Sequence, residues 1–195
     1  MKKSLVVFVH VIVLGSLLSG CNPIDKFFPQ ANGIILYGDQ QQIESSFKKV
    51  KTSLEEDAYS MKIAKVVDQE IVILEEKTAK ELVEKGLLKE VINGTDTEPV
   101  TSLRELKKHE MVLFAKEKLD EVTLEGKPLK VTYEGNIIIG DARVYGDMFL
   151  IVDDADWSAM KGTEKTIGIL KYDKDPSVEI GKFGVEREQL VKISE

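Results

Sequence analysis

The most reactive side chains in this sequence belong to its single cysteine, Cys21, and to its two histidines, His10 and His109. Cys21 follows a stretch that begins with two lysines, continues as an apolar core over residues 5–18, and ends in a serine and a glycine. A positive start, a short apolar core and a small-residue exit are typical of an export signal that a peptidase removes. We therefore predict cleavage between Gly20 and Cys21.

The residues Leu18-Ser19-Gly20-Cys21 resemble the lipobox of bacterial lipoproteins. The resemblance implies a diacylglyceryl thioether on Cys21 and attachment to membrane lipid on the extracytoplasmic face of the cell membrane. Two acyl chains give durable anchoring, whereas one chain holds a protein only marginally. The alternatives are an ordinary secretory signal with an incidental cysteine and a retained signal anchor. The apolar run is shorter than the roughly 20 residues that a membrane-spanning helix needs.

His109 is the only histidine left after cleavage, because His10 lies within the signal. Its charged neighbours over residues 107–110 favour a solvated position over a place in a catalytic triad. Since the lipid would occupy Cys21, a zinc site would depend on carboxylates, an unusual ligand set. The sequence also has no Gly-x-Ser-x-Gly elbow and no glycine-rich nucleotide motif. We therefore predict no catalytic residue, no metal site, no cofactor and no enzymatic activity.

The densest acidic cluster is Asp153-Asp154-Ala155-Asp156. A calcium loop of the EF-hand type needs acids at alternating positions, then a glycine and a distal glutamate. Trp157 and Ser158 stand where that pattern would continue, so the cluster does not match it. We interpret the acids as a helix start, where negative charge is favourable at the positive end of the helix dipole. Trp157, the only tryptophan, is interpreted as a core anchor rather than a platform for a ligand.

The net charge argues against one class of function. Removing residues 1–20 takes two lysines and no acid from the 27 basic and 34 acidic residues, which leaves a net charge of −9. Such a surface does not suit nucleic acid, whose backbone needs a basic footprint. It also repels anionic head groups, so we expect the domain to stand off the membrane apart from its tether. With the only cysteine lipidated, stability must come from a packed core without disulfides.

The apolar pattern predicts an α+β fold with a largely antiparallel sheet and a few short capped helices. Apolar or alternating runs bounded by turn residues indicate the strands. The expected strands are Ile34–Tyr37, Met61–Val67, Glu70–Leu74, Met111–Ala115, Glu121–Leu124, Leu129–Tyr133, Ile137–Ile139, Ala142–Tyr145, Met148–Val152, Thr166–Tyr172 and Gln189–Ile193.

Capping residues and the helical spacing of apolar side chains predict four helices. The first would run from Asp39 as far as Leu54, and the second would end at Gly86. The expected start signals are Asp39, the capping boxes Thr78 with Glu81 and Ser102 with Glu105, and Asp153 or Asp154.

The expected organisation is a signal peptide over residues 1–20, a lipidated tether over 21–32 and an extracytoplasmic α+β domain over 33–195. The polar stretch 93–100 contains an Asn-Gly turn and is the best internal boundary, so the domain could consist of two lobes split there. The paired phenylalanines at 27 and 28 could enter the lipid interface or pack on the domain.

Three runs in the second half of the chain, Glu110–Ala115, Glu125–Val131 and Met148–Trp157, suggest a strand, a hairpin with a glycine-lysine turn, and a strand leading into an acidic helix start. This order over residues 100–175 resembles the extracytoplasmic modules of FtsX/MacB-type ABC exporter permeases. Because the sequence lacks the membrane helices of a permease, the resemblance implies an associated protein rather than the transporter. The whole chain also resembles small lipoproteins of Bacillus-group bacteria, which implies no activity.

The leading hypothesis is a lipid-anchored, non-enzymatic accessory protein that docks on an ABC exporter permease or on its cargo. The alternative is a small ligand-binding lipoprotein of an import system, which is disfavoured because such proteins usually close two larger lobes around a solute. An envelope hydrolase ranks third, for want of a catalytic set.

Overall fold

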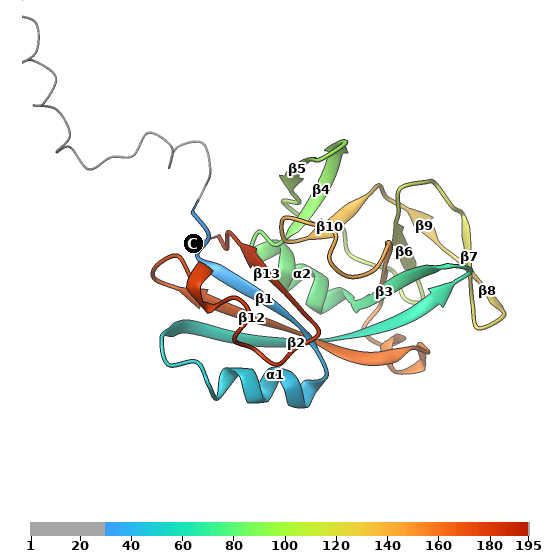
Figure 1. The fold of residues 1–195 in the computed structure, drawn as a ribbon. Coiled ribbons are helices and arrows are strands. Elements are labelled where there is room, and N and C mark those ends of the chain that lie inside the picture. Colours follow the sequence, from blue (N-terminus) through green and yellow to red (C-terminus); the bar gives the residue numbers. More distant parts are fainter. Residues whose placement is uncertain (1–29, 195) are drawn as a thin grey trace, which may run out of the picture. The chain divides into compact units, whose positions relative to one another are not determined.

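The computed structural model describes residues 30–194. The signal peptide, the cleavage site at Gly20, the lipid site at Cys21 and the paired phenylalanines at 27 and 28 lie outside the described residues. Residues 31–195 form one unit around an eight-stranded sheet (Figure 1). The expected α+β fold with a largely antiparallel sheet is confirmed.

The elements follow one another with short connections. In chain order they are β1 (Gly33–Gly38), α1 (Gln40–Phe47), β2 (Ser53–Val66), β3 (Gln69–Glu75), α2 (Glu76–Glu84), β4 (Leu88–Asn93), β5 (Asp96–Pro99), β6 (Met111–Phe114), β7 (Glu121–Leu124), β8 (Lys127–Lys130), β9 (Thr132–Tyr133), β10 (Ile137–Ile139), β11 (Met148–Val152), the 3₁₀ helix η2 (Trp157–Ala159), β12 (Thr163–Tyr172), the 3₁₀ helix η3 (Ser177–Glu179) and β13 (Arg187–Val191).

The large sheet has the strand order β13-β1-β12-β2-β3-β11-β6-β9. Neighbouring strands run antiparallel except for β3 with β11 and β6 with β9, which are parallel. The strands β10, β4 and β5 form a second sheet, and β7 with β8 forms a hairpin. The first and last strands, β1 and β13, lie side by side, so residues from both ends of the domain meet in one sheet.

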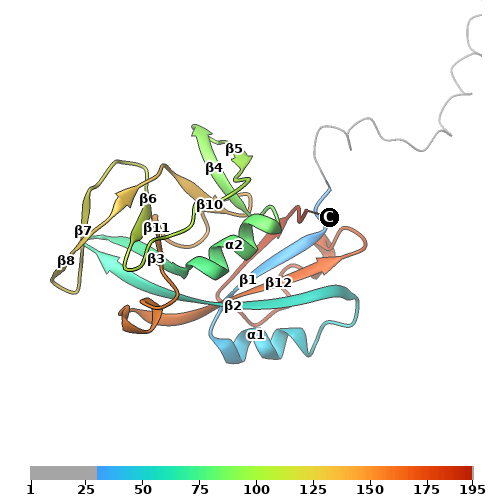
Figure 2. The same ribbon diagram turned by 180° about the vertical axis from the view of Figure 1, so that it is seen from behind.

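Helices α1 and α2 lie on opposite faces of the sheet (Figure 2). Apolar side chains on both faces account for this arrangement. On one face, Ile43 of α1 packs against Ile34, Leu36 and Leu170. Farther along that face, the β7–β8 hairpin adds a second cluster, which contains Val122, Leu124, Ile71, Ile73 and Leu150. On the other face, α2 places Ala79 and Leu82 in the largest cluster of buried residues. Alternation of side chains along each strand sends successive residues to these two faces.

The predicted capping box at Thr78 is wrong, because α2 begins two residues earlier and Thr78 is buried within it. The first turn instead receives an acceptor from a distant part of the chain: the Lys77 N–H donates to Asp154 Oδ1 at 3.1 Å. The predicted end is confirmed, since Gly86 has a φ of +67° just beyond the helix. A tertiary cap has therefore replaced the local one.

The predicted helix at Ser102 does not form, and residues 101–107 have no regular structure. Arg104 binds Glu110 with two hydrogen bonds of 2.8 Å and also contacts Glu134. The Leu106 N–H donates to a carboxylate of α2. These contacts with distant residues hold the segment in an irregular conformation that the local capping pattern did not predict.

Two further expectations differ from the structure. The first helix ends at Phe47 rather than extending to Leu54, which lies in β2 with 61 % of its surface exposed. Residues 142–145 form a loop rather than a strand, because side-chain contacts of Arg143, described below, anchor this stretch.

The polar stretch 93–100 is not a linker between lobes. Asn93 pairs with Asp96 in the β4–β5 hairpin, and the Val100 N–H donates to the carbonyl of Leu88. Residues 100–175 do not form a module of their own either, because their strands β11 and β12 pair with β3 and β2 from the first half of the chain.

Candidate functional site

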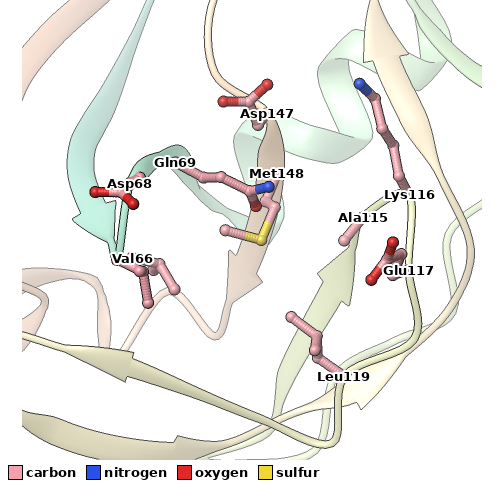
Figure 3. Close-up of a pocket in the computed structure, with 10 residues that line it drawn as sticks. Val66, Asp68, Gln69, Ala115, Lys116, Glu117, Leu119, Asp147 and Met148 are labelled. Atoms are coloured by element: carbon pink, nitrogen blue, oxygen red, sulfur yellow. The ribbon is translucent and has the colours of Figure 1, made fainter.

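A cavity of about 430 Å³ opens at one end of the large sheet. Its walls come from the β2–β3 turn, the stretch after β6 and the start of β11, and Met148 lies between the other two segments (Figure 3). Small-ligand sites usually have volumes of roughly 300–1,000 Å³. The lining residues are Val66, Val67, Asp68, Gln69, Ala115, Lys116, Glu117, Leu119, Asp147 and Met148.

Val67 stands out at the rim of this cavity. It is the most exposed large hydrophobic residue of the described part of the chain, at 86 %. Its φ of +57° is left-handed, a conformation in which a β-branched residue is strained. Leu119, which also lines the cavity, is partly exposed as well. Strained residues of this kind gather at sites of recognition and catalysis, so the rim is a candidate contact surface.

The wall formed by Asp147 and Met148 is held in place by Arg143. The guanidinium of Arg143 donates to the carbonyl of Asp147 at 2.6 Å and to that of Ile137 at 3.0 Å. It also lies 5.7 Å from the centre of the Phe149 ring. Burial lowers the pKa of Arg143 from its ordinary value. These contacts make the 142–147 loop a fixed part of the cavity.

Gly146 allows the same loop to pass close to β3. Its φ is +73°, and a Cβ atom at this position would lie 2.5 Å from Cγ2 of Val72. The close approach lets the Asp147 N–H donate to the carbonyl of Glu70 at 2.7 Å. A larger residue would strain the backbone and displace the cavity wall.

The chain enters the domain at the opposite end of the sheet. Asn32 donates its backbone N–H to Val191 and its Nδ2 to Ile193, and it accepts bonds from the N–H groups of Ile193 and Tyr172, all at 2.7–3.1 Å. Strand β2 pairs with Tyr172 at its first residue and reaches the cavity at its last. Its 14 residues span roughly 45 Å at about 3.3 Å each, which separates entry point and cavity.

The cavity combines an apolar interior with charged side chains at its mouth. Apolar side chains of Val66, Ala115 and Met148 are buried, while the charged residues Lys116 and Glu117 are exposed. An apolar site with a mixed polar rim can hold an apolar ligand or an apolar side chain of a partner.

The structure does not bring His109 into the cavity. His109 precedes β6 at the other end of that strand and has a left-handed φ of +64°. Its imidazole is 65 % exposed, as the charged surroundings predict, and its Nδ1 lies 2.8 Å from Oδ1 of Asp156. Within residues 30–194, that carboxylate is its only side-chain hydrogen-bond partner.

The acidic side chains at 153–156 do not share one site, because each contacts a different partner. Asp153 accepts a bond from the Ala155 N–H, Asp154 caps α2, and Asp156 faces His109. The cluster precedes η2, so the predicted short helix is present as a single 3₁₀ turn. Within residues 30–194, no three His, Cys, Asp or Glu side chains are grouped to hold a metal ion.

Trp157 has both packing and polar contacts. It is partly buried against the cluster that contains Met160. The ammonium group of the buried Lys62 lies 4.6 Å from the centre of its ring and donates to the Trp157 and Met160 carbonyls at 2.9 and 3.0 Å. Trp157 therefore packs against the core as expected, and it also contacts a charged side chain.

An α+β domain preceded by a lipobox-like sequence is the organisation expected of a bacterial lipoprotein. Residues 31–194 match the Uncharacterised lipoprotein family, and the chain belongs to this family. A crystal structure described as that of a lipoprotein from Bacillus anthracis is 30% identical, with a TM-score of 0.76, and the match covers 84% of this chain and 100% of that one. No curated protein matches significantly. None of the helices within residues 30–194 is long and apolar enough to cross a membrane.

Sequence reasoning did not find the cavity. The predicted strands Met61–Val67, Met111–Ala115 and Met148–Val152 supply part of its lining, but their patterns carry no signal for a binding site. The lining segments are separated by tens of residues and meet only because β3, β11 and β6 are neighbours in the sheet. Val67 was predicted as the last residue of a strand, whereas the structure places it in the β2–β3 turn with its side chain exposed.

Proposed function

We propose that this lipoprotein is a non-enzymatic accessory protein, anchored through lipid on Cys21 at the extracytoplasmic face, that binds a membrane protein partner with its cavity end. The observation that carries the proposal is the position of the strained, exposed Val67 at the rim of an apolar cavity. The cavity lies at the opposite end of the sheet from Asn32, where the chain enters the domain. Anchoring at one end leaves the other end free to meet a partner.

The tether supports a partner within or close to the membrane. Eleven residues follow Cys21 up to Asn32, and a chain of this length reaches at most roughly 35–40 Å when extended. Confinement to this zone raises the effective concentration for a membrane partner, so a weak contact suffices. An ABC exporter permease is the class of partner that the sequence hypothesis names.

Site-specific photocrosslinking in intact cells tests the proposal. A photoreactive amino acid at position 67 is expected to give a crosslink to an ABC permease, identified by mass spectrometry. Val178 is the matched control, because it is also an exposed valine, at 74 %, and lies outside the cavity. Equal crosslinking from both positions, or crosslinks from position 67 to soluble cargo alone, would reject docking through the cavity.

The volume of the cavity favours one alternative, a small ligand-binding lipoprotein of an import system. Native mass spectrometry of the protein purified from its own cells distinguishes the two. A co-purifying small molecule that is lost when Met148 is changed to Gln would support ligand delivery. A ligand-free protein that retains the crosslink at position 67 would support the accessory function.

A further inference from the structure

Strand β2 is paired unequally along its length. It pairs with β12 from Ser53 to Ile63, but with β3 only from Lys62 to Val66. Within the described residues, the 53–61 stretch therefore has a strand neighbour on one side only. On its other side, the backbone N–H and C=O groups of this stretch face no strand among residues 30–194, because β3 turns away from β2 toward α2 (Figure 2). We call this side of residues 53–61 the free edge of β2.

A groove of about 410 Å³ runs along this free edge. One wall is the edge itself, from Asp57 to Ser60. The other wall is the end of β3 and the start of α2, with Trp157 also lining the groove. A free edge beside an open groove is the geometry in which an extended peptide adds a strand to a sheet.

The two faces of the edge offer different chemistry. Ala58 and Ser60 lie on the same face as Lys62, whose ammonium group contacts the Trp157 ring, so this face offers small side chains beside the indole. Asp57 lies on the opposite face, where it forms an ion pair of 2.8 Å with Lys85 beyond α2. An added strand would alternate its side chains between these faces, because successive residues point in opposite directions.

Negative charge dominates the second face. Burial, followed by the carboxylates of Asp57, Glu81 and Glu84, raises the pKa of Tyr59. Glu75 lies at the groove end on the other face, that of Lys62, where burial and the carboxylate of Asp154 raise its pKa. Lys77 is the only basic residue that lines the groove. Because Asp57 is paired with Lys85, Glu81 and Glu84 of α2 supply the negative charge that is complementary to a basic segment.

We propose that the free edge of β2 binds an extended basic segment of a partner protein by strand addition, with lysine or arginine residues facing Glu81 and apolar residues facing Trp157. A second copy of this chain is a poorer occupant. Antiparallel pairing of two such edges would bring Glu55, Glu56 and Asp57 close to the same residues of the other copy, and like charges opposite each other are destabilising. The inference does not depend on the cavity at the other end of β2.

The probe is a synthetic octapeptide that alternates lysine and valine, added to the full-length lipoprotein in detergent micelles. Trp157 is the only tryptophan in the chain, so its fluorescence reports binding in the groove directly. The same peptide with alternate backbone nitrogens methylated keeps its charge but cannot form the strand hydrogen bonds on one edge. Hydrogen–deuterium exchange then shows which backbone amides the peptide protects.

The expected result is a saturable change in Trp157 fluorescence, protection of amides within residues 53–61, and at least about tenfold weaker binding of the methylated peptide. The double variant Glu81→Gln/Glu84→Gln should weaken binding by about threefold to tenfold. The control Glu98→Gln/Glu121→Gln removes two exposed carboxylates elsewhere and should leave binding unchanged.

Three results would overturn the proposal. The first is equal affinity for the methylated peptide, which would indicate charge attraction without strand pairing. The second is protection at another edge, such as β13, instead of β2. The third is protection of residues 53–61 that depends on protein concentration without peptide, which would identify a second copy as the occupant.

Discussion

At one end of the large sheet, Asn32 joins two other backbone segments, at Tyr172 and at residues 191–193, through four hydrogen bonds, whereas at the other end Val67 projects into solvent from a strained turn. The first arrangement fixes the point where the tether meets the domain. The second leaves an apolar side chain exposed to solvent beside a cavity. The contrast suggests that the entry end is built for firm attachment and the cavity end for contact with another molecule.

The largest expected effect is on the predicted lipid anchor, because the comparison of the two ends assumes that the chain is anchored through Cys21. Cys21→Ala removes the thiol that would receive the diacylglyceryl group, so labelling with a radioactive fatty acid should disappear completely. The wild-type chain expressed at the same level is the control. Continued labelling of the variant would show that lipid is attached elsewhere, and the two ends would lose their assigned roles.

At the entry end, Asn32→Ala should lower the free energy of unfolding by roughly 1–3 kcal/mol, the cost of leaving a buried polar group without its partner. The substitution deprives the N–H and carbonyl of Ile193 of their bonds to the amide side chain. Urea denaturation measures the change. The matched variant Asn93→Ala alters an exposed asparagine and should change stability by less than about 0.5 kcal/mol. Equal effects would contradict the firm attachment of this end.

At the cavity end, Val67→Asn should raise the free energy of unfolding by up to about 1 kcal/mol, because asparagine tolerates a left-handed φ better than valine. The same change should weaken binding of the partner captured from position 67. Val178→Asn, at an exposed valine without a left-handed φ, should do neither. A destabilised but fully binding Val67→Asn variant would show that this turn serves the fold alone.

The smallest expected effect is on the pH dependence of stability, and it concerns Glu110, which belongs to neither the entry site nor the cavity. Hydrogen bonds from Arg104 and from the Lys107 backbone lower the pKa of Glu110 to about 2, from an ordinary 4.5. A folded-state pKa below the unfolded one means that this stabilisation is complete above about pH 4.5. It is lost as the pH falls toward 2. Glu110→Gln should therefore flatten the acid limb of the stability profile, measured by thermal unfolding from pH 2 to 7. Glu98→Gln should leave that limb unchanged.

The features that sequence reasoning recovered were local ones. The apolar runs Ile34–Tyr37 and Met148–Val152 depend on side chains close together in the chain. Both runs form buried strands at the predicted places. Gly86 ends α2 as expected, because a left-handed φ after a helix is a local requirement. The class of fold and the predicted lipid anchor both follow from patterns of this kind.

Contacts between distant residues set the rest. Asp154 caps α2 from more than seventy positions away, and Arg104 keeps a stretch with a helical signal irregular by binding Glu110 and Glu134. The cavity exists because three strand ends from different parts of the chain lie together. Likewise, the free edge of β2 arises where β3 diverges after only five paired residues. Capping and apolar patterns record the preferences of a few neighbouring residues, so they carry no information about which strands become partners or where pairing stops.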